Sequence, residues 1–236
     1  MSVQGFVQAL MRGARGKDAA KALILPYEMV FASIAGGGGG GLPDGYTKLS
    51  GIEFSASTYY LITDFRLTGA DTVSFSFVAS KACNVLGCYT STTSGNNYSL
   101  YVSLANNARY LRYDGGTYLS QVVANQRYDV VITPTGATGF ERESSWEQKD
   151  FTADVDMCIG TTSASASSSK LDGALYGDII VSDRLHLVPC MRDSDGVIGY
   201  YDLIGKTFYE PIGSAPSPIQ FSNNVGYALV GQATVV

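Results

Sequence analysis

Apolar and polar residues alternate along several short segments of the chain, and residues typical of turns bound each segment. An alternating segment places one set of side chains in a core and the other in solvent, as in a strand of an antiparallel sheet. Two sheets that each carry one apolar face pack together as a sandwich. The alternating segments are residues 72–78, 98–102, 108–113, 128–132 and 176–181. We therefore predict an all-β antiparallel sandwich with few helices after residue 41.

Turn residues separate these segments. Asp114-Gly115-Gly116 lies between Tyr113 and Thr117-Tyr118, and this sequence predicts a tight hairpin. Ser94-Gly95-Asn96-Asn97 predicts a second hairpin. Residues 163–169 contain only Ser and Ala, and a segment of such low complexity need not hold one conformation. The pattern is that of short strands joined by turns and a few longer loops.

The first 35 residues follow a helical pattern instead. Their apolar residues recur at spacings of three and four, which predicts an amphipathic helix or a pair of short helices that Pro26 ends. We predict that this segment is an anchor that docks on a partner. The candidate contacts are Phe6, Val7, Leu10, Met11 and Leu23. A secretory signal that ends near Ala35 is an alternative, but Pro26 and Glu28 interrupt its apolar run.

Six consecutive glycines, residues 36–41, follow this segment. Glycine has no side chain to pack and loses the most backbone entropy on ordering, so such a run behaves as a flexible tether. We therefore divide the chain into an N-terminal anchor (1–35), a glycine linker (36–41), a sandwich domain (42–221) and a C-terminal extension (222–236). The alternative is that the N-terminal segment packs back onto its own domain.

The segment from Val188 to Tyr209 carries the most specific signal in the chain. It comprises a strand that ends at Pro189, a polar turn with Gly196 where a positive φ is needed, a short apolar strand, and a second turn at Ile204-Gly205-Lys206. This segment resembles the closing part of laminin-G-like, concanavalin A-like jelly-roll modules, which occur in phage virion proteins and in surface proteins of gut bacteria. The first strands of these modules resemble Leu42 to Leu49, Ile52-Glu53, Thr58 to Tyr60, and Thr63.

The resemblance implies a concanavalin A-like antiparallel jelly roll over residues 42–221. It also implies a non-enzymatic phage virion protein, such as a fibre, spike or decoration subunit, that docks on other virion proteins through residues 1–35. Such a protein is located on the virion after assembly in the cytoplasm of the host bacterium. A bacterial surface lectin or adhesin is one alternative, and a chain processed after Ala35 would favour it. A purely structural capsid or tail subunit without a glycan ligand is the other.

The charge of the chain argues against nucleic acid as a partner. Sixteen Lys and Arg residues stand against 21 Asp and Glu residues, which gives a net charge of −5. The basic residues are spread thinly, whereas a phosphate-binding face needs them clustered. The apolar run of the N-terminal segment is too short to cross a membrane. We therefore expect neither nucleic acid nor a membrane span.

The sequence predicts no catalytic residue. Carbohydrate-cleaving enzymes of this fold carry paired carboxylates on one strand, in an E-x-D-x-x-E pattern, because a nucleophile and an acid must lie on the same face. The nearest pattern, Glu141 to Glu147, lacks the central Asp, so Glu143 and Glu147 are expected in a solvated loop. His186, the single histidine, is expected to be a partly exposed strand residue without a catalytic partner.

The four cysteines are too few for a disulfide-stapled scaffold of this length. Their apolar surroundings favour buried thiols, and free thiols fit a reducing cytoplasm. A local disulfide between Cys83 and Cys88 is an alternative, and the spacing of these two residues is wrong for a zinc site. The remaining cysteines are Cys158 and Cys190.

We predict no cofactor, with a calcium ion as the alternative. Asp193, Asp195 and Asp202 have the chemistry of calcium ligands and lie close together in the sequence. The same residues also suit plain turns in which each carboxylate caps its own backbone.

Carbohydrate is the ligand class that suits such a sandwich. Sugars stack their apolar faces on exposed aromatic rings, while loop Asn and Asp side chains bind the hydroxyl groups. The candidate ligand contacts are Trp146, Tyr98, Asn97, Tyr113 and Tyr118. For each Tyr, a core or cross-strand role is the alternative.

We also predict a homo-oligomer, and a trimer if the protein is a fibre. Weak binding at each site gives usable avidity only when several copies engage together. The apolar run from Tyr227 to Val230 is a second candidate contact between copies, because an exposed apolar strand at a sheet edge invites pairing.

Overall fold

A computed structural model of the protein describes residues 41–54, 59–89, 96–103, 108–113, 116–140, 144–162, 170–213 and 217–219. These residues form strands and turns and contain no helix, as the alternating pattern predicts. Accordingly, none of them belongs to a helix long and apolar enough to span a membrane. The predicted anchor contacts in residues 1–35 and the run from Tyr227 to Val230 lie outside the described residues. The domain boundaries stay predictions.

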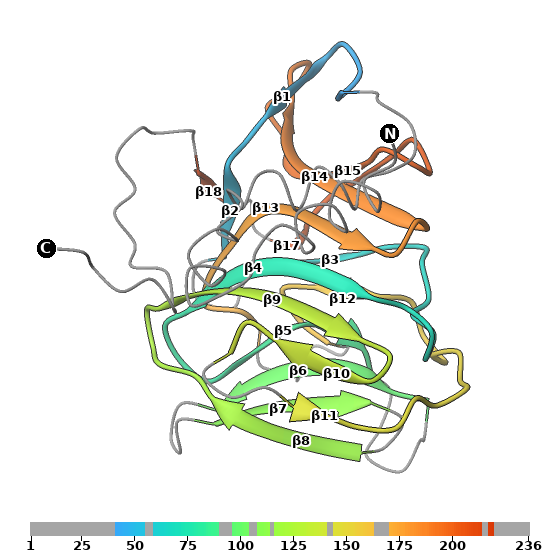
Figure 1. The fold of residues 1–236 in the computed structure, drawn as a ribbon. Coiled ribbons are helices and arrows are strands. Elements are labelled where there is room, and N and C mark those ends of the chain that lie inside the picture. The colour runs from blue at the N-terminus through green and yellow to red at the C-terminus, as the bar shows by residue number, and fades with distance from the viewer. Residues whose placement is uncertain are drawn as a thin grey trace, which may run out of the picture. The chain divides into compact units, whose positions relative to one another are not determined.

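The strands form two antiparallel sheets (Figure 1). The strands of the larger sheet are, in chain order, β1 (Tyr46–Lys48), β2 (Gly51–Phe54), β4 (Val73–Ala79), β9 (Arg127–Thr133), β10 (Gly136–Thr138), β11 (Ser144–Ser145), β13 (Gly173–Val181), β14 (Leu185–Arg192), β15 (Ile198–Asp202), β16 (Thr207–Tyr209) and β18 (Ser217–Ile219). Eight of them follow the order β11-β10-β9-β4-β13-β14-β15-β16. In addition, β1 pairs with β14, β2 pairs with β13, and β18 pairs with β2.

The smaller sheet has the order β17-β3-β12-β5-β6-β7-β8. Its strands are, in chain order, β3 (Tyr59–Ile62), β5 (Cys83–Cys88), β6 (Tyr98–Ser103), β7 (Ala108–Tyr113), β8 (Gly116–Gln121), β12 (Cys158–Ile159) and β17 (Ile212–Gly213). Chain neighbours β5, β6, β7 and β8 are joined as successive antiparallel pairs, whereas β3, β12 and β17 come from distant parts of the chain.

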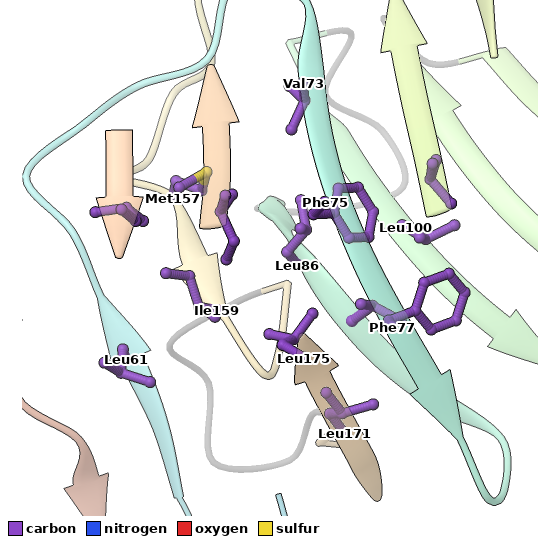
Figure 2. Close-up of a cluster of buried hydrophobic side chains, with 14 of the residues drawn as sticks. Leu61, Val73, Phe75, Phe77, Leu86, Leu100, Met157, Ile159, Leu171 and Leu175 are labelled. Carbon is purple, nitrogen blue, oxygen red and sulfur yellow. The ribbon is translucent and has the colours of Figure 1, made fainter. Parts of the chain in front are cut away.

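The hydrophobic core lies between the two sheets. Figure 2 shows Val73, Phe75 and Phe77 of β4 in this core together with Leu86 of β5 and Leu100 of β6. Phe77 has no exposed surface, and burying a side chain of this size contributes about 1.5–3 kcal/mol to folding. Each sheet therefore supplies an apolar face, as a sandwich requires.

Strand β9 shows the predicted alternation most clearly. Tyr128, Val130 and Ile132 are buried, while the residues before, between and after them are only partly buried. The period of two in the sequence thus corresponds to one face on the core and one face away from it.

The predicted hairpin after Tyr113 is confirmed by strand pairing. β7 and β8 run antiparallel with Tyr113 opposite Gly116, so residues 114–115, themselves outside the described residues, connect the two strands. The closing hairpins are also present, because β14 pairs with β15 and β15 pairs with β16. Gly196, in the turn between β14 and β15, has the positive φ of 73° that the sequence predicts.

One expectation about these strands is wrong, because β14 does not end at Pro189 but continues to Arg192. The carbonyl of Pro189 accepts a hydrogen bond from the backbone N–H of Leu49 (2.8 Å). Leu49 lies between β1 and β2, where the neighbouring strand is interrupted. A proline is tolerated at such a break because no regular ladder bond needs its missing N–H.

Candidate functional site

The candidate site lies on the face of the larger sheet that points away from the core, which we call the outer face. Leu185 and Leu187 of β14 are buried in the core, so His186 between them lies on the outer face. The same face continues across the sheet, because Ile180 of β13 lies opposite His186 and Ser74 of β4 lies opposite Ile180. Alternation alone thus places a row of residues from three strands on this surface.

A bulge in β13 interrupts the regular pairing at the centre of this face. The register between β13 and β4 shifts between Tyr176 and Ile180. Within the bulge, Gly177 has a φ of 62°, which glycine adopts readily, and its N–H donates a hydrogen bond to the carbonyl of Ser50 (2.8 Å). Bulges redirect side chains, and this one brings Asp178 to the place where β13 changes its neighbour from β2 to β14.

Asp178 is the centre of a charged cluster on the outer face. Its Oδ2 atom lies 2.8 Å from Nε2 of His186, and its Oδ1 atom lies 3.4 Å from Nζ of Lys48. Burial alone would raise the pKa of Asp178, but the hydrogen bond with His186 and the charge of Lys48 outweigh it and lower that pKa below 3.8. The side chains of His186 and Asp178 remain 20% and 24% exposed, so both reach the surface.

Three aromatic rings lie together on the same face, and we call them the aromatic patch. The ring centroid of Tyr46 lies 4.9 Å from that of Tyr201 and 5.3 Å from that of Phe208. All three side chains are partly buried, so each ring keeps an accessible part. Tyr201 and Phe208 are opposite one another in β15 and β16, and Tyr46 is two residues from Lys48 on β1. The patch therefore borders the charged cluster.

Arg192 supports one side of the aromatic patch. Its guanidinium carbon lies 5.0 Å from the ring centroid of Phe208, a distance suited to a cation–π contact. Its Nη2 atom lies 2.6 Å from Asp195 Oδ2, and its Nη1 atom lies 2.6 Å from Glu210 Oε1. The hydrogen bonds that Arg192 donates to Asp195, and next those to Glu210, raise the pKa of Arg192, and the contact with Arg192 lowers the pKa of Asp195. The guanidinium is thus fixed between two exposed carboxylates.

Taken together, the outer face presents aromatic carbon surface beside carboxylate oxygens. Such a surface offers stacking to a flat apolar group and hydrogen-bond acceptors to hydroxyl groups. The bulge beside the Asp178 and His186 pair and the strands that hold the rings belong to one sheet, which positions both groups.

The structure corrects two of the predicted ligand contacts. Tyr98 has no exposed surface and Asn97 is 1% exposed, so neither side chain is available on the surface. Tyr98 and Leu100 both point into the core because alternate residues of β6 share a face. The alternative of a core role for Tyr98 is the one that the structure shows.

The other predicted ligand contacts stay predictions. Trp146 follows β11 and is partly buried, with its ring packed against the core. Tyr113 and Tyr118 lie on β7 and β8, and Tyr113 is directly opposite Tyr98. The side chains of Tyr113 and Tyr118 lie outside the described part of the structure. None of these residues belongs to the strands that form the aromatic patch.

Sequence reasoning missed the aromatic patch and the partner of His186. A signal for the patch was present at Tyr200 and Tyr201, since consecutive strand residues point to opposite faces and one of the two must leave the core. Tyr200 is fully buried and Tyr201 is not. For Asp178, alternation with Ile180 indicates the face that it shares with His186, but the path of the chain at the bulge, which the sequence does not reveal, determines the contact.

The predicted calcium ligands have other partners. Asp195 accepts a hydrogen bond from the N–H of Val197, and Asp202 accepts hydrogen bonds from the N–H groups of Ile204 and Gly205. These are the turn-capping contacts that the sequence offered as the alternative. Asp193 accepts a hydrogen bond from the hydroxyl of Thr47. The described residues contain no group of three or more His, Cys, Asp or Glu side chains placed to hold a metal ion.

Of the two carboxylates considered for glycoside hydrolysis, Glu147 lies within the described residues. Glu147 is exposed and lies 3.5 Å from Nζ of Lys149, which is the solvated arrangement that the sequence predicts. Glu143 lies outside the described residues.

All four cysteines are buried and free. The sequence predicts this burial, and the alternative of a disulfide between Cys83 and Cys88 is not formed. Burial raises the pKa of Cys83 and Cys158 to about 11, and that of Cys88 and Cys190 to about 12. Thiols with such pKa values are unreactive at neutral pH, so they pack as small apolar side chains.

Neither a family model nor a curated protein matches the chain. Among solved structures, its fold is similar to that of a "putative carbohydrate binding protein" from Bacteroides ovatus, with a TM-score of 0.50 and 16% sequence identity. The match covers 73% of this chain and 62% of that one, so the chain spans less than two thirds of that protein. The likeness shows a shared β-sandwich fold, and a fold alone does not assign a ligand.

Proposed function

We propose that the sandwich binds carbohydrate at the aromatic patch. The observation that carries the proposal is the cluster of three partly exposed rings, Tyr46, Tyr201 and Phe208, beside the carboxylates of Asp178, Asp195 and Glu210. Aromatic rings supply flat apolar surface to the C–H faces of a sugar ring. Carboxylate oxygens accept hydrogen bonds from its hydroxyl groups.

Two further considerations support this proposal. The rings are held by three different strands and by Arg192, so they need little reordering on binding, which lowers the entropic cost. The solved structure from Bacteroides ovatus carries carbohydrate binding in its description, and it shares the sandwich. We also propose that the sandwich has the concanavalin A-like jelly-roll topology that the resemblance implies.

The test is a glycan array on the full-length protein, followed by titration of the best ligand. Tyr201→Ala and Phe208→Ala should each weaken binding at least tenfold, since truncating an aromatic hot spot costs about 2 kcal/mol or more and about 1.4 kcal/mol is tenfold in affinity. Tyr60→Ala is the matched control, because Tyr60 is a partly buried ring on β3 of the smaller sheet. Circular dichroism checks that each variant is folded. The proposal would be overturned if Tyr201→Ala and Phe208→Ala bound the ligand as tightly as Tyr60→Ala does, or if the wild-type protein bound no glycan on the array.

We propose binding without catalysis. Carbohydrate-cleaving enzymes need two carboxylates on one face at a defined separation. Glu147 is exposed and forms an ion pair with Lys149, an arrangement typical of a solvated loop residue. Release of reducing ends from a bound glycan by the wild-type protein, abolished in Glu147→Gln or Glu143→Gln, would contradict this part of the proposal.

For the place of action, we propose display on a phage particle, as the resemblance of residues 188–209 implies. The sandwich would be joined to other virion proteins through residues 1–35 and would act as an oligomer. A bacterial surface lectin would use the same sandwich. Mass spectrometry of purified particles tests this proposal. The full chain should be among the structural proteins, whereas a chain processed after Ala35 on a bacterial surface would contradict the proposal.

A further inference from the structure

We propose that the aromatic patch selects uncharged sugars over acidic ones, and that Asp195 and Glu210 determine this selectivity. This inference rests on the proposed carbohydrate function and specifies its ligand class. The cations next to the rings are already paired with the protein's own carboxylates.

Arg192 lies against the Phe208 ring, and each nitrogen of its guanidinium already donates to a carboxylate of the protein. Nε lies 3.1 Å from both carboxylate oxygens of Asp195, Nη2 lies 2.6 Å from Asp195 Oδ2, and Nη1 lies 2.6 Å from Glu210 Oε1. An arginine that binds an acidic sugar offers its positive charge and a pair of N–H donors to the carboxylate of the ligand. Here, two carboxylates of the protein already balance that charge, so a ligand carboxylate would compete with them for the guanidinium.

Lys48, two residues from Tyr46 on β1, also forms an ion pair with a carboxylate of the protein. Its ammonium lies 3.4 Å from Asp178 Oδ1, and the second oxygen of Asp178 contacts His186. The Lys48 charge is therefore balanced by Asp178 before any ligand arrives. A neutral sugar does not require this cation, because its hydroxyl groups can donate to carboxylates and accept from water or from N–H groups.

The wider surroundings of the patch are acidic. β1, the bulge of β13 and residues 185–210 contribute four carboxylates to these surroundings, Asp178, Asp193, Asp195 and Glu210, and three cations, Lys48, Arg192 and Lys206, whereas Asp202 is buried and points away from the outer face. Lys206 is an exposed residue in the turn before β16, where water screens its charge. An additional carboxylate on a ligand would meet repulsion from Asp195 and Glu210, which are both exposed beside Phe208.

The experiment compares matched ligands on the full-length protein. Cello-, manno-, galacto- and maltohexaose are each titrated beside the same oligosaccharide oxidised at C6 to the carboxylate. Wild-type protein should bind at least one neutral hexaose, and the oxidised form should bind at least about tenfold more weakly, at low ionic strength. Equal or tighter binding of the oxidised form would overturn the inference while leaving the proposed function intact. Binding of neither form would overturn the proposed function as well.

The second arm releases Arg192. The double variant Asp195→Asn with Glu210→Gln keeps side chains of similar size, and Asn can still cap the turn at Val197. The difference between neutral and oxidised ligand should shrink at least threefold or reverse. Glu147→Gln is the control, since it removes one exposed carboxylate beyond β11, at the opposite end of the strand order of the larger sheet. An unchanged ratio in the double variant, or the same shift in Glu147→Gln, would overturn the assignment of Asp195 and Glu210.

Discussion

His186 Nε2 lies 2.8 Å from Asp178 Oδ2, and this contact joins β14 to the bulge of β13. The two residues are eight positions apart in the sequence, on neighbouring strands that pair only from Ile179 onward. Alternation places Asp178 on the same face as Ile180, which lies opposite His186. The bulge lies at the same point of β13, where the register with β4 shifts, so it determines how closely Asp178 approaches His186 within that face.

The Asp178 pairing predicts a pH-dependent contribution to stability. Because its pKa is lowered in the folded state, the folded protein keeps Asp178 ionised at a lower pH than the unfolded chain does. The contribution is fully present above the ordinary pKa of 3.8 and is lost as the pH falls through the lower, folded pKa. Asp178→Asn should lower the free energy of unfolding by about 1–2 kcal/mol at pH 7.

Urea unfolding at pH 7 and at pH 3 measures this effect, and the difference between wild type and Asp178→Asn should be smaller at pH 3. Asp156→Asn is the control, because Asp156 forms an exposed ion pair with Arg66. Exposed pairs contribute less than about 1 kcal/mol. A destabilisation of Asp178→Asn that is the same at both pH values would contradict the electrostatic origin.

Gly199 predicts a steric test of the aromatic patch. A Cβ atom at Gly199 would lie 2.2 Å from the carbonyl oxygen of Tyr209 and 2.9 Å from Cζ of Phe208. Gly199→Ala should therefore displace β16 and the Phe208 ring, lower stability by about 1–3 kcal/mol, and weaken glycan binding. Gly41→Ala is the control, since a Cβ there meets nothing within 4 Å. Thermal unfolding and titration with the array ligand are the measurements, and a Gly199→Ala protein that behaves like Gly41→Ala would refute the expected crowding.

The thiols predict a labelling experiment. With pKa values of about 11 to 12, all four cysteines should react with a thiol reagent at pH 8 far more slowly than a free thiol does, and they should react fully after unfolding in urea. Mass spectrometry measures how many reagent molecules are attached to each chain. Rapid labelling of any cysteine in the folded protein would show that its site opens or is exposed.

The N-terminal anchor predicts a truncation experiment. The described core residues begin at Leu49, so a protein that starts at residue 36 should keep the β-sheet circular dichroism of the full chain. The same truncation should abolish association with the particle or partner that the predicted anchor binds. Light scattering on both proteins should also show a smaller assembly for the truncated form. Loss of the β-sheet signal would mean that the first 35 residues are part of the sandwich.

Much of the fold followed from local patterns in the sequence. The alternation of Tyr128, Val130 and Ile132 predicted a strand with one buried face, and the structure has it. The turn residues predicted the hairpin from Tyr113 to Gly116 and the positive φ of Gly196. These features depend on neighbours in the chain, whose steric and hydrophobic preferences act wherever the segment lies.

Tertiary structure alone decided which residues face the surface and which of them meet. A period of two defines two faces but not which one is buried, so the sequence left both a ligand role and a core role open for Tyr98, and the residue lies in the core. The aromatic patch combines β1 with β15 and β16, more than 150 residues later, and sequence spacing carries no information about that pairing. Asp178 meets His186 beside a bulge in β13, whose position depends on how β13 fits two neighbouring strands at once.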